Sequence, residues 1–307
     1  MEGVIVKSTG SFYLVKTKEE EPITARIRGK FRLQNHRLTN PIAVGDVVTL
    51  SEEEDQEGIR VITEIKDRKN YMIRKSNKLT SRAQIIASNL DNALLFITLK
   101  EPVTSTGFID RFLITAEAYH IPTILVFNKI DCYNKEEEEV LDMYCRLYSD
   151  IGYTCFKINS TDPNSVKTLT DYLQNKTCLI SGHSGVGKST FVNHLLKGTN
   201  QKTKQISISS SRGQHTTTFA EMFLGPDGIR IIDTPGISDF GVIDIPEQEI
   251  AHYFIEFKEY MNDCKYNNCI HTNEPQCAVL KAVEDGKIDE ERYYNYLSIM
   301  RNEDTHR

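Results

Sequence analysis

The feature that most constrains this chain is the order of two short motifs. Residues 182–189 have the sequence G-H-S-G-V-G-K-S and fit G-x-x-x-x-G-K-[ST], the pattern of a phosphate-binding loop, whereas residues 128–131 have the sequence N-K-I-D, a tetrad that selects guanine. In an ordinary GTPase the phosphate loop comes first, and here it comes second. A pocket is defined in space, so a chain cut at one loop and rejoined at its former termini can rebuild the same sheet. The reversed order therefore predicts a circularly permuted α/β domain.

The phosphate-binding loop is the strongest local signal. The apolar run 177–181 suits a buried parallel strand and residues 190–196 can begin a helix, so the helix N-terminus would face the phosphates. Backbone amides would wrap the phosphates, Lys188 would reach the β- and γ-phosphates, and the Ser189 hydroxyl would ligate magnesium. The alternative, a glycine-rich turn without nucleotide, is disfavoured by this strand and helix. The expected nucleotide contacts are Gly182, His183, Ser184, Gly185, Val186, Gly187, Lys188, Ser189 and Thr190.

The tetrad at 128–131 predicts the choice of base. It follows the apolar run 123–127 and so lies at the carboxyl end of a strand, where doubly wound sheets bind ligands. Asp131 would accept hydrogen bonds from guanine N1–H and the 2-amino group, whereas adenine offers neither donor and would leave the carboxylate unpaired. Asn128 would bridge the base-side and phosphate-side loops, and the Lys129 stem would cover the ring. Together with the phosphate loop, the tetrad indicates GTP rather than ATP.

A third element would complete a magnesium site. Residues 228–232 are expected to form a strand that ends in D-T-P-G at 233–236, a common turn sequence by itself, but a GTPase element when it follows a phosphate loop. Asp233 would hold magnesium through water, and the Gly236 amide would sense the γ-phosphate. Between the two motifs, R-G-Q-H-T-T-T at 212–218 offers threonine hydroxyls for the magnesium shell, and Thr217 is the one we favour.

The C-terminal part of the chain carries a second constellation. The pattern C-x4-C-x-H-x5-C gathers three thiols and one imidazole, the complement of a closed tetrahedral zinc site. The alternative is chance clustering, but the other four cysteines are scattered and suit small core positions. Residues 246–263 and 277–302 show helical apolar spacing, which predicts a small helical domain held together by metal. The expected structural zinc ligands are Cys264, Cys269, His271 and Cys277.

These motifs resemble those of the circularly permuted bacterial GTPases of the ribosome small subunit-dependent GTPase A family. The likeness spans essentially the whole chain, with a β-rich front, a permuted GTPase middle and the cysteine-rich tail. It implies an assembly factor that binds the nearly mature small ribosomal subunit near its decoding region, hydrolyses GTP there and leaves. One motif differs, because N-S-T at 159–161 stands where a S-A-K-like loop should touch the guanine carbonyl. Asn159 and Ser160 are therefore expected to contribute through their backbone.

The group that orients the attacking water is the open question of the chemistry. Ile237 follows the D-T-P-G element, where many GTPases carry a glutamine, and an isoleucine cannot orient water. We favour His215 for this role, the alternative being that it is a solvated loop histidine. His183 inside the phosphate loop is a rival, although its side chain could equally turn outward while its amide binds phosphate. The expected catalytic residues are His215, Lys188 and Thr217.

The first part of the chain is expected to contact RNA. Short strands at 3–6, 12–15 and 44–50, separated by turns, are compatible with a five-stranded barrel of the OB type. In the run 25–32 the basic residues occupy every second position and so share one face, which suits RNA phosphates. The alternative is a solvated strand edge guarded by charge. The basic residues of this run and of the connection that follows are Arg26, Arg28, Lys30, Arg32, Arg68, Lys69, Arg74, Lys75, Lys78 and Arg82.

Composition limits the class of protein. With 37 basic and 43 acidic residues the formal net charge is −6, so RNA binding must depend on local patches. Seven cysteines, no secretory start and no apolar run long enough to span a bilayer predict a cytoplasmic protein without membrane contact. The length allows three domains: an OB-fold RNA-binding domain at 1–70, a circularly permuted P-loop GTPase domain at 71–242 and an α-helical zinc-binding domain at 243–307. A monomer is expected.

The sequence thus predicts a GTPase that couples its nucleotide state to docking on the small ribosomal subunit and its rRNA, during late maturation of that subunit. Its expected cofactors are one structural Zn²⁺ and Mg²⁺ with GTP. One rival is an RNA-associated scaffold that holds GTP or GDP and scarcely hydrolyses it, which Ile237 keeps open. The other is a translation factor that acts on tRNA or on another ribosomal particle.

Overall fold

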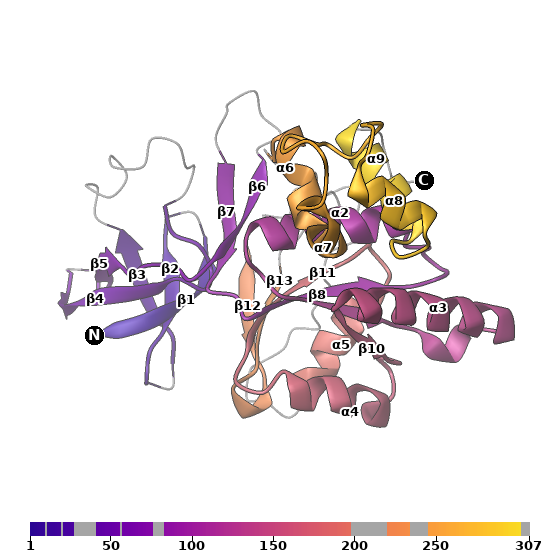
Figure 1. Ribbon diagram of the computed structural model, residues 1–307. Coiled ribbons are helices and arrows are strands. Elements are labelled where there is room, and N and C mark those ends of the chain that lie inside the picture. Colours follow the sequence, from indigo (N-terminus) through magenta and orange to yellow (C-terminus); the bar gives the residue numbers. More distant parts are fainter. Residues whose placement is uncertain are drawn as a thin grey trace.

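A β-barrel, an α/β sheet and a group of short helices follow one another along the chain (Figure 1). The computed structural model describes residues 1–9, 11–19, 21–27, 41–55, 57–75, 83–197, 220–233 and 245–301. Nine residues singled out from the sequence lie outside the described residues: Arg28, Lys30, Arg32, Lys78, Arg82, His215, Thr217, Gly236 and Ile237.

The first five strands close into a barrel. They are β1 (Glu2–Ser8), β2 (Tyr13–Lys16), β3 (Ile23–Ile27), β4 (Val47–Glu54) and β5 (Arg60–Ile65). Their order is β1-β2-β3-β5-β4, and β4 returns to pair with β1, which closes the ring. Neighbouring strands are antiparallel except β3 and β5, which run parallel. Alternate side chains such as Val15, Ala25, Val48 and Ile62 fill the interior, and the expected OB-type barrel is confirmed.

The middle of the chain forms a mainly parallel sheet. Its strands are β8 (Asn92–Ile97), β9 (Thr123–Phe127), β10 (Thr154–Lys157), β11 (Thr177–Ser181), β12 (Glu221–Leu224) and β13 (Arg230–Asp233). They lie in the order β10-β9-β8-β11-β13-β12, and β12 is the one antiparallel member of this set. A two-stranded hairpin of β6 (Tyr71–Lys75) and β7 (Ala83–Ser88) precedes the sheet.

Helices cover both faces of this sheet. They are α2 (Thr106–Ala118), α3 (Lys135–Ile151), α4 (Pro163–Tyr172) and α5 (Lys188–Leu195). In β8, Leu95 and Ile97 pack into the core shared with α2 and α3, whereas Leu94 and Phe96 pack into the core shared with α4 and α5. This alternation follows from the two-residue period of a strand, and burial on both faces explains why these strands are apolar throughout. The described helices are each too short or too polar to cross a bilayer.

The segment that rejoins the permuted chain is short and ordered. Helix α4 begins at an Asp162 cap with Pro163 in its first turn, positions that suit both residues, and it ends shortly before β11. Between them Asn175 adopts a left-handed conformation, and its backbone amide donates to the Asp227 carbonyl at 3.0 Å. The prediction that residues 165–176 form mostly one helix is confirmed, and the mainly parallel strand order agrees with the permuted α/β domain expected from the sequence.

The barrel and the sheet are joined by strand pairing. Lys7 of β1 pairs with Glu221 of β12, and their side chains form an ion pair at 2.9 Å. The barrel is also joined to the β6–β7 hairpin at the fully buried Asp46, which accepts from Arg68 Nε and Nη2, both at 2.7 Å, and from Ser88 Oγ at 2.6 Å. Because Arg68 is committed to this buried carboxylate, it does not belong to the basic RNA-facing set predicted from the sequence.

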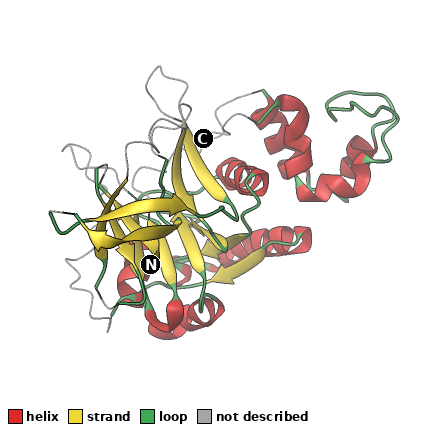
Figure 2. Cartoon of the chain, turned by 90° about the vertical axis from the view of Figure 1, so that its left-hand side faces the viewer, coloured by secondary structure: helices red, strands yellow, loops and turns green. Residues whose placement is uncertain are grey.

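The last part of the chain consists of short helices that pack on α2. They are α6 (Glu247–Ile250), η3 (Ala251–Tyr253), η4 (Ile255–Phe257), α7 (Lys258–Met261), α8 (Ala278–Glu284) and α9 (Glu290–Met300). Figure 2 shows a group of helices standing to one side of the strands. The segment 246–263, whose spacing is helical, forms several short helices because Phe254 has an extended backbone and turns its buried ring into the core of this group.

Candidate nucleotide site and metal cluster

The phosphate-binding loop links β11 to α5, as its sequence predicts. Gly182 and Gly187 have φ angles of +131° and +99°, which side chains rarely tolerate. A Cβ at Gly182 would lie 2.4 Å from the Phe96 carbonyl oxygen, and one at Gly187 would lie 2.1 Å from Asn128 Nδ2. The loop is therefore folded tightly against the ends of β8 and β9, and both glycines are required by contact as well as by conformation.

Lys188 occupies the centre of this loop. Its Nζ donates to the carbonyl oxygens of Gly182 and His183, both at 2.6 Å. Burial lowers the pKa of Lys188 to about 8, and the neighbouring Asp233 carboxylate acts in the opposite direction. Asp233 lies at the end of β13, level with Ile180 in β11, and is buried. A lysine ammonium partly stripped of water beside backbone amides is an electrostatic arrangement suited to a polyanion such as a triphosphate.

Asn128 connects three loops at the ends of the strands. It is buried, its Nδ2 donates to the Val186 carbonyl oxygen at 2.7 Å, and its Oδ1 accepts from Ser160 N at 3.0 Å and Ser160 Oγ at 2.9 Å. The phosphate loop, the tetrad and the 159–161 segment, which are far apart in sequence, thus share one side chain. The Asn128 side-chain amide therefore holds these three segments together.

The remaining tetrad residues face outward from this junction. Lys129 has a left-handed backbone with φ of 64°, and its Nζ donates to the Glu101 carbonyl oxygen. Asp131 lies in a short turn and is exposed, so its carboxylate is accessible to a base. The Asn159 side chain is used locally, since its Oδ1 accepts from Thr161 N at 2.9 Å and from Thr161 Oγ1 at 2.6 Å. A direct side-chain role for Asn159 at the base is therefore not supported.

Sequence reasoning missed Tyr133, two residues after the tetrad. Its hydroxyl donates to the Asn128 carbonyl oxygen at 2.7 Å and accepts from Leu99 N at 3.0 Å. Burial raises the pKa of the Tyr133 hydroxyl, which keeps it protonated and able to donate. The tetrad backbone is thus tied to the segment that follows β8. An aromatic residue next to a ligand-binding turn was the available signal, but its partner Leu99 lies beyond any local pattern.

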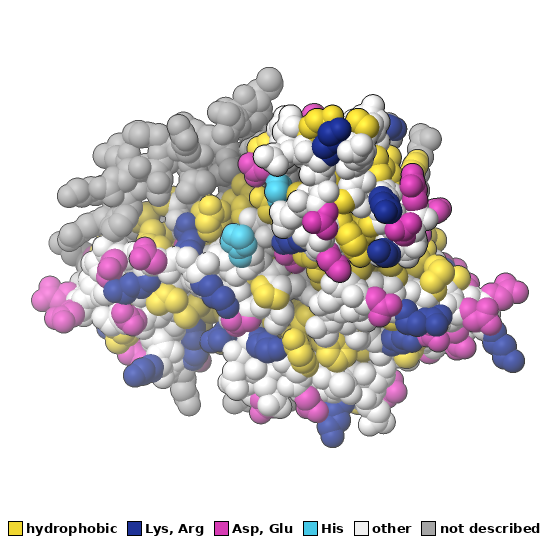
Figure 3. All heavy atoms as spheres, in the orientation of Figure 1, with side chains coloured by type: hydrophobic (Ala, Val, Ile, Leu, Met, Phe, Trp, Pro, Cys, Tyr) yellow, Lys and Arg dark blue, Asp and Glu magenta, His cyan; other side chains and the backbone are white. Residues whose placement is uncertain are grey.

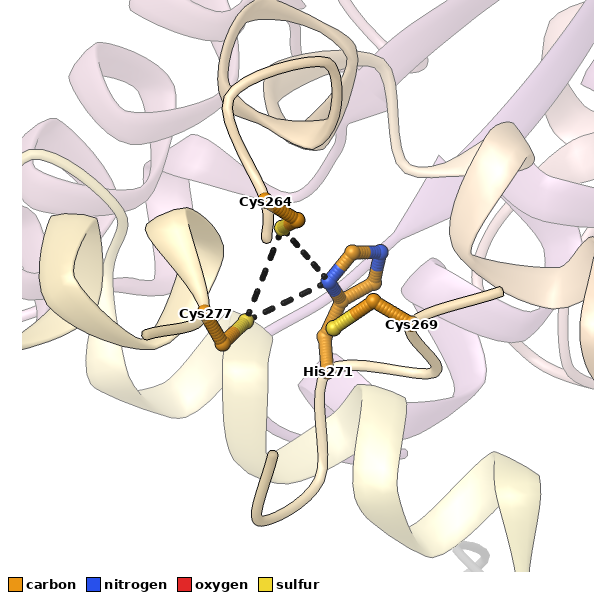
Figure 4. Close-up of side chains that lie close together, drawn as sticks. All are labelled: Cys264, Cys269, His271 and Cys277. Atoms are coloured by element: carbon orange, nitrogen blue, oxygen red, sulfur yellow. Dashed lines mark hydrogen bonds between the residues drawn. The ribbon is translucent and has the colours of Figure 1, made fainter. Parts of the chain in front are cut away.

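The four predicted zinc ligands come together in space (Figure 4). One ligand atom from each residue lies within 4.8 Å of every other. His271 Nδ1 is 3.6 Å from Cys264 Sγ and 3.4 Å from Cys277 Sγ, and the two sulfurs are 3.9 Å apart. Bond lengths of about 2.0–2.3 Å around a tetrahedral ion place ligand atoms about 3.5–3.8 Å apart. The cluster of Cys264, Cys269, His271 and Cys277 can therefore hold a metal ion.

Backbone turns and hydrogen bonds shape this cluster before any ion binds. His271 has a positive φ of 57°, and the Glu274 carboxylate accepts from the amides of Ile270 and Thr272 at 2.8 and 2.9 Å. The Cys277 sulfur caps α8 by accepting from Leu280 N at 3.4 Å. Such N–H···S bonds favour a thiolate.

The electrostatics of the protein groups alone nevertheless oppose ionised thiols at Cys269 and Cys277. Burial raises the pKa of Cys269 to about 12 and raises that of Cys277, and it lowers the pKa of His271. A cation is needed to convert these thiols to thiolates near neutral pH, and metal binding would release protons.

Two protein families match the chain. The family described as RsgA GTPase matches residues 65–243, and the family described as RsgA N-terminal domain matches residues 2–59. Together they include the first four barrel strands, the hairpin and the α/β sheet with its phosphate loop and tetrad.

Curated relatives extend this likeness to the tail. The protein named Small ribosomal subunit biogenesis GTPase RsgA 2 from Bacteroides thetaiotaomicron is 49% identical over 304 residues, covering 99% of this chain and 97% of its own. Small ribosomal subunit biogenesis GTPase RsgA from Flavobacterium psychrophilum is 50% identical over 307 residues, covering 99% and 94%.

Solved structures agree over the same length. The crystal structure of YjeQ from Thermotoga maritima superposes with a TM-score of 0.79 at 32% identity and covers 98% of this chain and 97% of its own. That of YloQ, described as a circularly permuted GTPase, gives 0.76 at 31% identity and covers 98% and 94%. The assignment follows from the strand order, from the phosphate loop together with the tetrad, and from the sequence identity along the whole chain. The chain belongs to the RsgA GTPase family and is a GTP hydrolase.

Proposed function

We propose that this GTPase acts in the biogenesis of the small ribosomal subunit, where it hydrolyses GTP and couples its nucleotide state to docking and release. The observation that carries this proposal is the identity of nearly half of all residues, over almost the whole length of both chains, with relatives named for that role. The partners would be the small subunit, its rRNA and GTP or GDP, bound by a monomer in the cytoplasm.

The proposed nucleotide site follows the loops that Asn128 ties together. Residues 182–190 would bind the phosphates, with Lys188 exchanging its two carbonyl partners for phosphate oxygens. Ser189 and Asp233 would hold Mg²⁺, because Ser189 lies in the first turn of α5 and Asp233 ends β13, the strand beside β11. Asp131 would read guanine, with the backbone of 159–160 beside it. His215, Thr217 and Gly236, which lie outside the described residues, keep the roles proposed from sequence.

The metal in the Cys/His cluster is proposed to be a structural Zn²⁺. Three sulfurs and one imidazole nitrogen within 4.8 Å of one another form a complete and soft ligand set, which suits zinc. His271 is almost fully buried and Cys277 is buried, which suits a structural ion. The domain limits 1–70, 71–242 and 243–307 remain our proposal.

The RNA-binding surface is proposed to be local. Arg26, the first residue of the predicted basic row, points away from the barrel interior but pairs with Asp55 at 2.7 Å and Glu57 at 3.3 Å. On the face shown in Figure 3, lysine and arginine side chains alternate with acidic ones over the barrel and the sheet. Phosphate contact would therefore require exchange of intramolecular ion pairs for RNA, which makes the affinity sensitive to salt.

The decisive experiment is release of inorganic phosphate from GTP by the purified protein, alone and with isolated small or large ribosomal subunits. We expect slow turnover alone and marked stimulation by small subunits. Absence of stimulation would favour a scaffold that retains nucleotide, and stimulation by large subunits would favour a translation factor. His215→Ala should retain GTP binding and lose the stimulated rate, and an unchanged stimulated rate would remove His215 from the mechanism.

A further inference from the structure

Helix α2 is the element shared by the phosphate loop and the metal-bearing tail. Its residues from Thr106 to Ala116 are all buried, because the sheet covers one side and the tail covers the other. Figure 1 shows α2 between the sheet and the helices α6 to α9. A helix buried along most of its length has little room to move without repacking a neighbour.

One face of α2 contacts the phosphate loop through a pair of rings. The centroids of Phe108 and His183 are 4.1 Å apart, and their planes are inclined by 31°. Phe108 is buried, and His183 is the second residue of the loop. The His183 carbonyl oxygen is one of the two acceptors for Lys188 Nζ. The Phe108 ring therefore packs against the residue whose carbonyl oxygen holds Lys188.

The opposite face of α2 is held by a buried charge cluster. Asp110, two residues after Phe108, is rotated about 200° around the helix axis. It accepts from Arg292 Nη1, from Asn295 Nδ2 at 2.7 Å and from the Tyr148 hydroxyl at 2.9 Å, and both Asp110 and Arg292 are at most 1% exposed. Arg292 also grips Glu256 with Nε at 2.8 Å and Nη2 at 2.9 Å. Most of these donors and acceptors belong to the tail.

A second link joins the start of α2 to the tail. Thr106 Oγ1 donates to the Glu291 carboxylate at 2.6 Å, so the first turn of α2 is tied to the first turn of α9. The segment before α2 also contacts the nucleotide loops, since Lys129 Nζ donates to the Glu101 carbonyl oxygen and Pro102 lies beside Gly185. Contacts with the tail thus fix the position of α2, and α2 with the segment before it contacts both the phosphate loop and the tetrad.

We propose that Phe108 is a positioning residue for the phosphate loop, acting through the His183 ring, and that the tail sets Phe108 through the Asp110–Arg292 cluster. His183 then serves nucleotide binding by packing rather than by acid–base chemistry. This inference rests on the proposed placement of the nucleotide in the phosphate loop. It makes the metal-bearing tail a determinant of nucleotide affinity.

The first test measures GDP and GTP affinity with fluorescent nucleotides in the full-length, metal-loaded protein. Phe108→Leu should weaken both by about three- to tenfold, the size of an aromatic pair, whereas Phe112→Leu, one turn further along α2, should change them less than about twofold. His183→Ala should match Phe108→Leu, and His183→Phe, which keeps a ring against Phe108, should restore affinity and turnover. Equal effects of Phe108→Leu and Phe112→Leu, or full affinity in His183→Ala, would overturn the proposal.

The second test uses the unaltered protein, so that folding of a variant is not at issue. Because coupling between two sites is reciprocal, GDP should slow hydrogen exchange of the backbone amides of α2 and α9 and leave β4 and β5 of the barrel unchanged. Unchanged hydrogen exchange in α9 would contradict the claim that the tail positions Phe108. If the wild-type protein bound no guanine nucleotide, the proposed function itself would fail. If the wild-type protein bound GDP and GTP but Phe108→Leu bound them equally well, only this inference would fail.

Discussion

The nucleotide loops and the metal cluster lie on either side of the same helix but are built in different ways. The nucleotide loops are ends of strands whose side chains are buried on both faces, and Asn128 and Tyr133 tie those ends together. The four candidate metal ligands come from turns between the short helices α7 and α8, and burial raises the pKa of two of their thiols, Cys269 and Cys277. The first site is formed by the core of the protein, whereas the second needs an ion to be complete.

Loss of the metal should have the largest effect. Cys277→Ala removes a ligand and the cap of α8, and structural zinc supplies about 10 kcal/mol or more of apparent binding free energy to small domains. We expect the variant to lose its metal and the tail to become sensitive to protease, while the sheet stays folded. Metal content and limited proteolysis are the measurements, and Cys132→Ala, an exposed cysteine far from the cluster in sequence, is the control. A protected tail without metal would contradict the contrast drawn above.

Lys188→Ala tests the other half of the comparison. Two charge-assisted contacts to phosphate are worth about 3 kcal/mol or more together, so GDP and GTP affinity should fall by at least about 100-fold. The melting temperature of the unliganded protein should hardly change, because this lysine is buried at the cost of hydration. Isothermal titration and thermal melting measure the two quantities, with Lys197→Ala, an exposed lysine beyond the same helix, as the control. Normal phosphate release by Lys188→Ala would refute the assignment of the loop.

Asp131→Asn should change the choice of base without loosening the phosphates. Guanine would lose two hydrogen bonds to a carboxylate, about 2–3 kcal/mol, whereas xanthine carries a carbonyl at position 2 that an amide can serve. GTP affinity should fall by about 100-fold and xanthosine triphosphate affinity should rise. Competition binding with both nucleotides decides the matter, and Asp150→Asn on α3 should leave the preference as it is. A variant that still prefers GTP would remove Asp131 from base recognition.

The pH dependence of nucleotide binding should be the smallest effect. The pKa of Lys188 without ligand is about 8, and bound phosphate raises it. Below that pH the lysine is protonated in both states and affinity is flat, whereas above it binding requires proton uptake. GDP affinity should therefore decline between pH 8 and pH 9, by up to about tenfold per unit. Titrations in two buffers of different ionisation enthalpy would detect the proton, and Lys188→Ala should show no such slope.

The sequence predicted the functional groups of a site wherever residues close together in the chain form that site. The glycines around Lys188 stand where the backbone needs positive φ, and the spacing of Cys264, Cys269, His271 and Cys277 suits one ion. Periodicity also gave the barrel and the sheet, because strands buried on both faces must be apolar throughout. Expectations drawn from charge alone were less successful, since Arg68 serves a buried carboxylate and Arg26 is paired with acids.

Long-range contacts could not be foreseen in this way. No pattern near Phe108 indicates His183, and none near Asp110 indicates Arg292, because such partners are chosen by how layers stack after the chain has folded. The break at Phe254 within the helical segment 246–263 has the same origin. Its ring packs into a core whose other members come largely from residues outside that segment. The sequence by itself determined which chemistry the chain carries, because each motif gathers its hydrogen-bonding groups or metal ligands within a short stretch of the chain. Only the tertiary structure decided which elements hold those groups in place, because packing depends on shape complementarity between segments far apart in the chain.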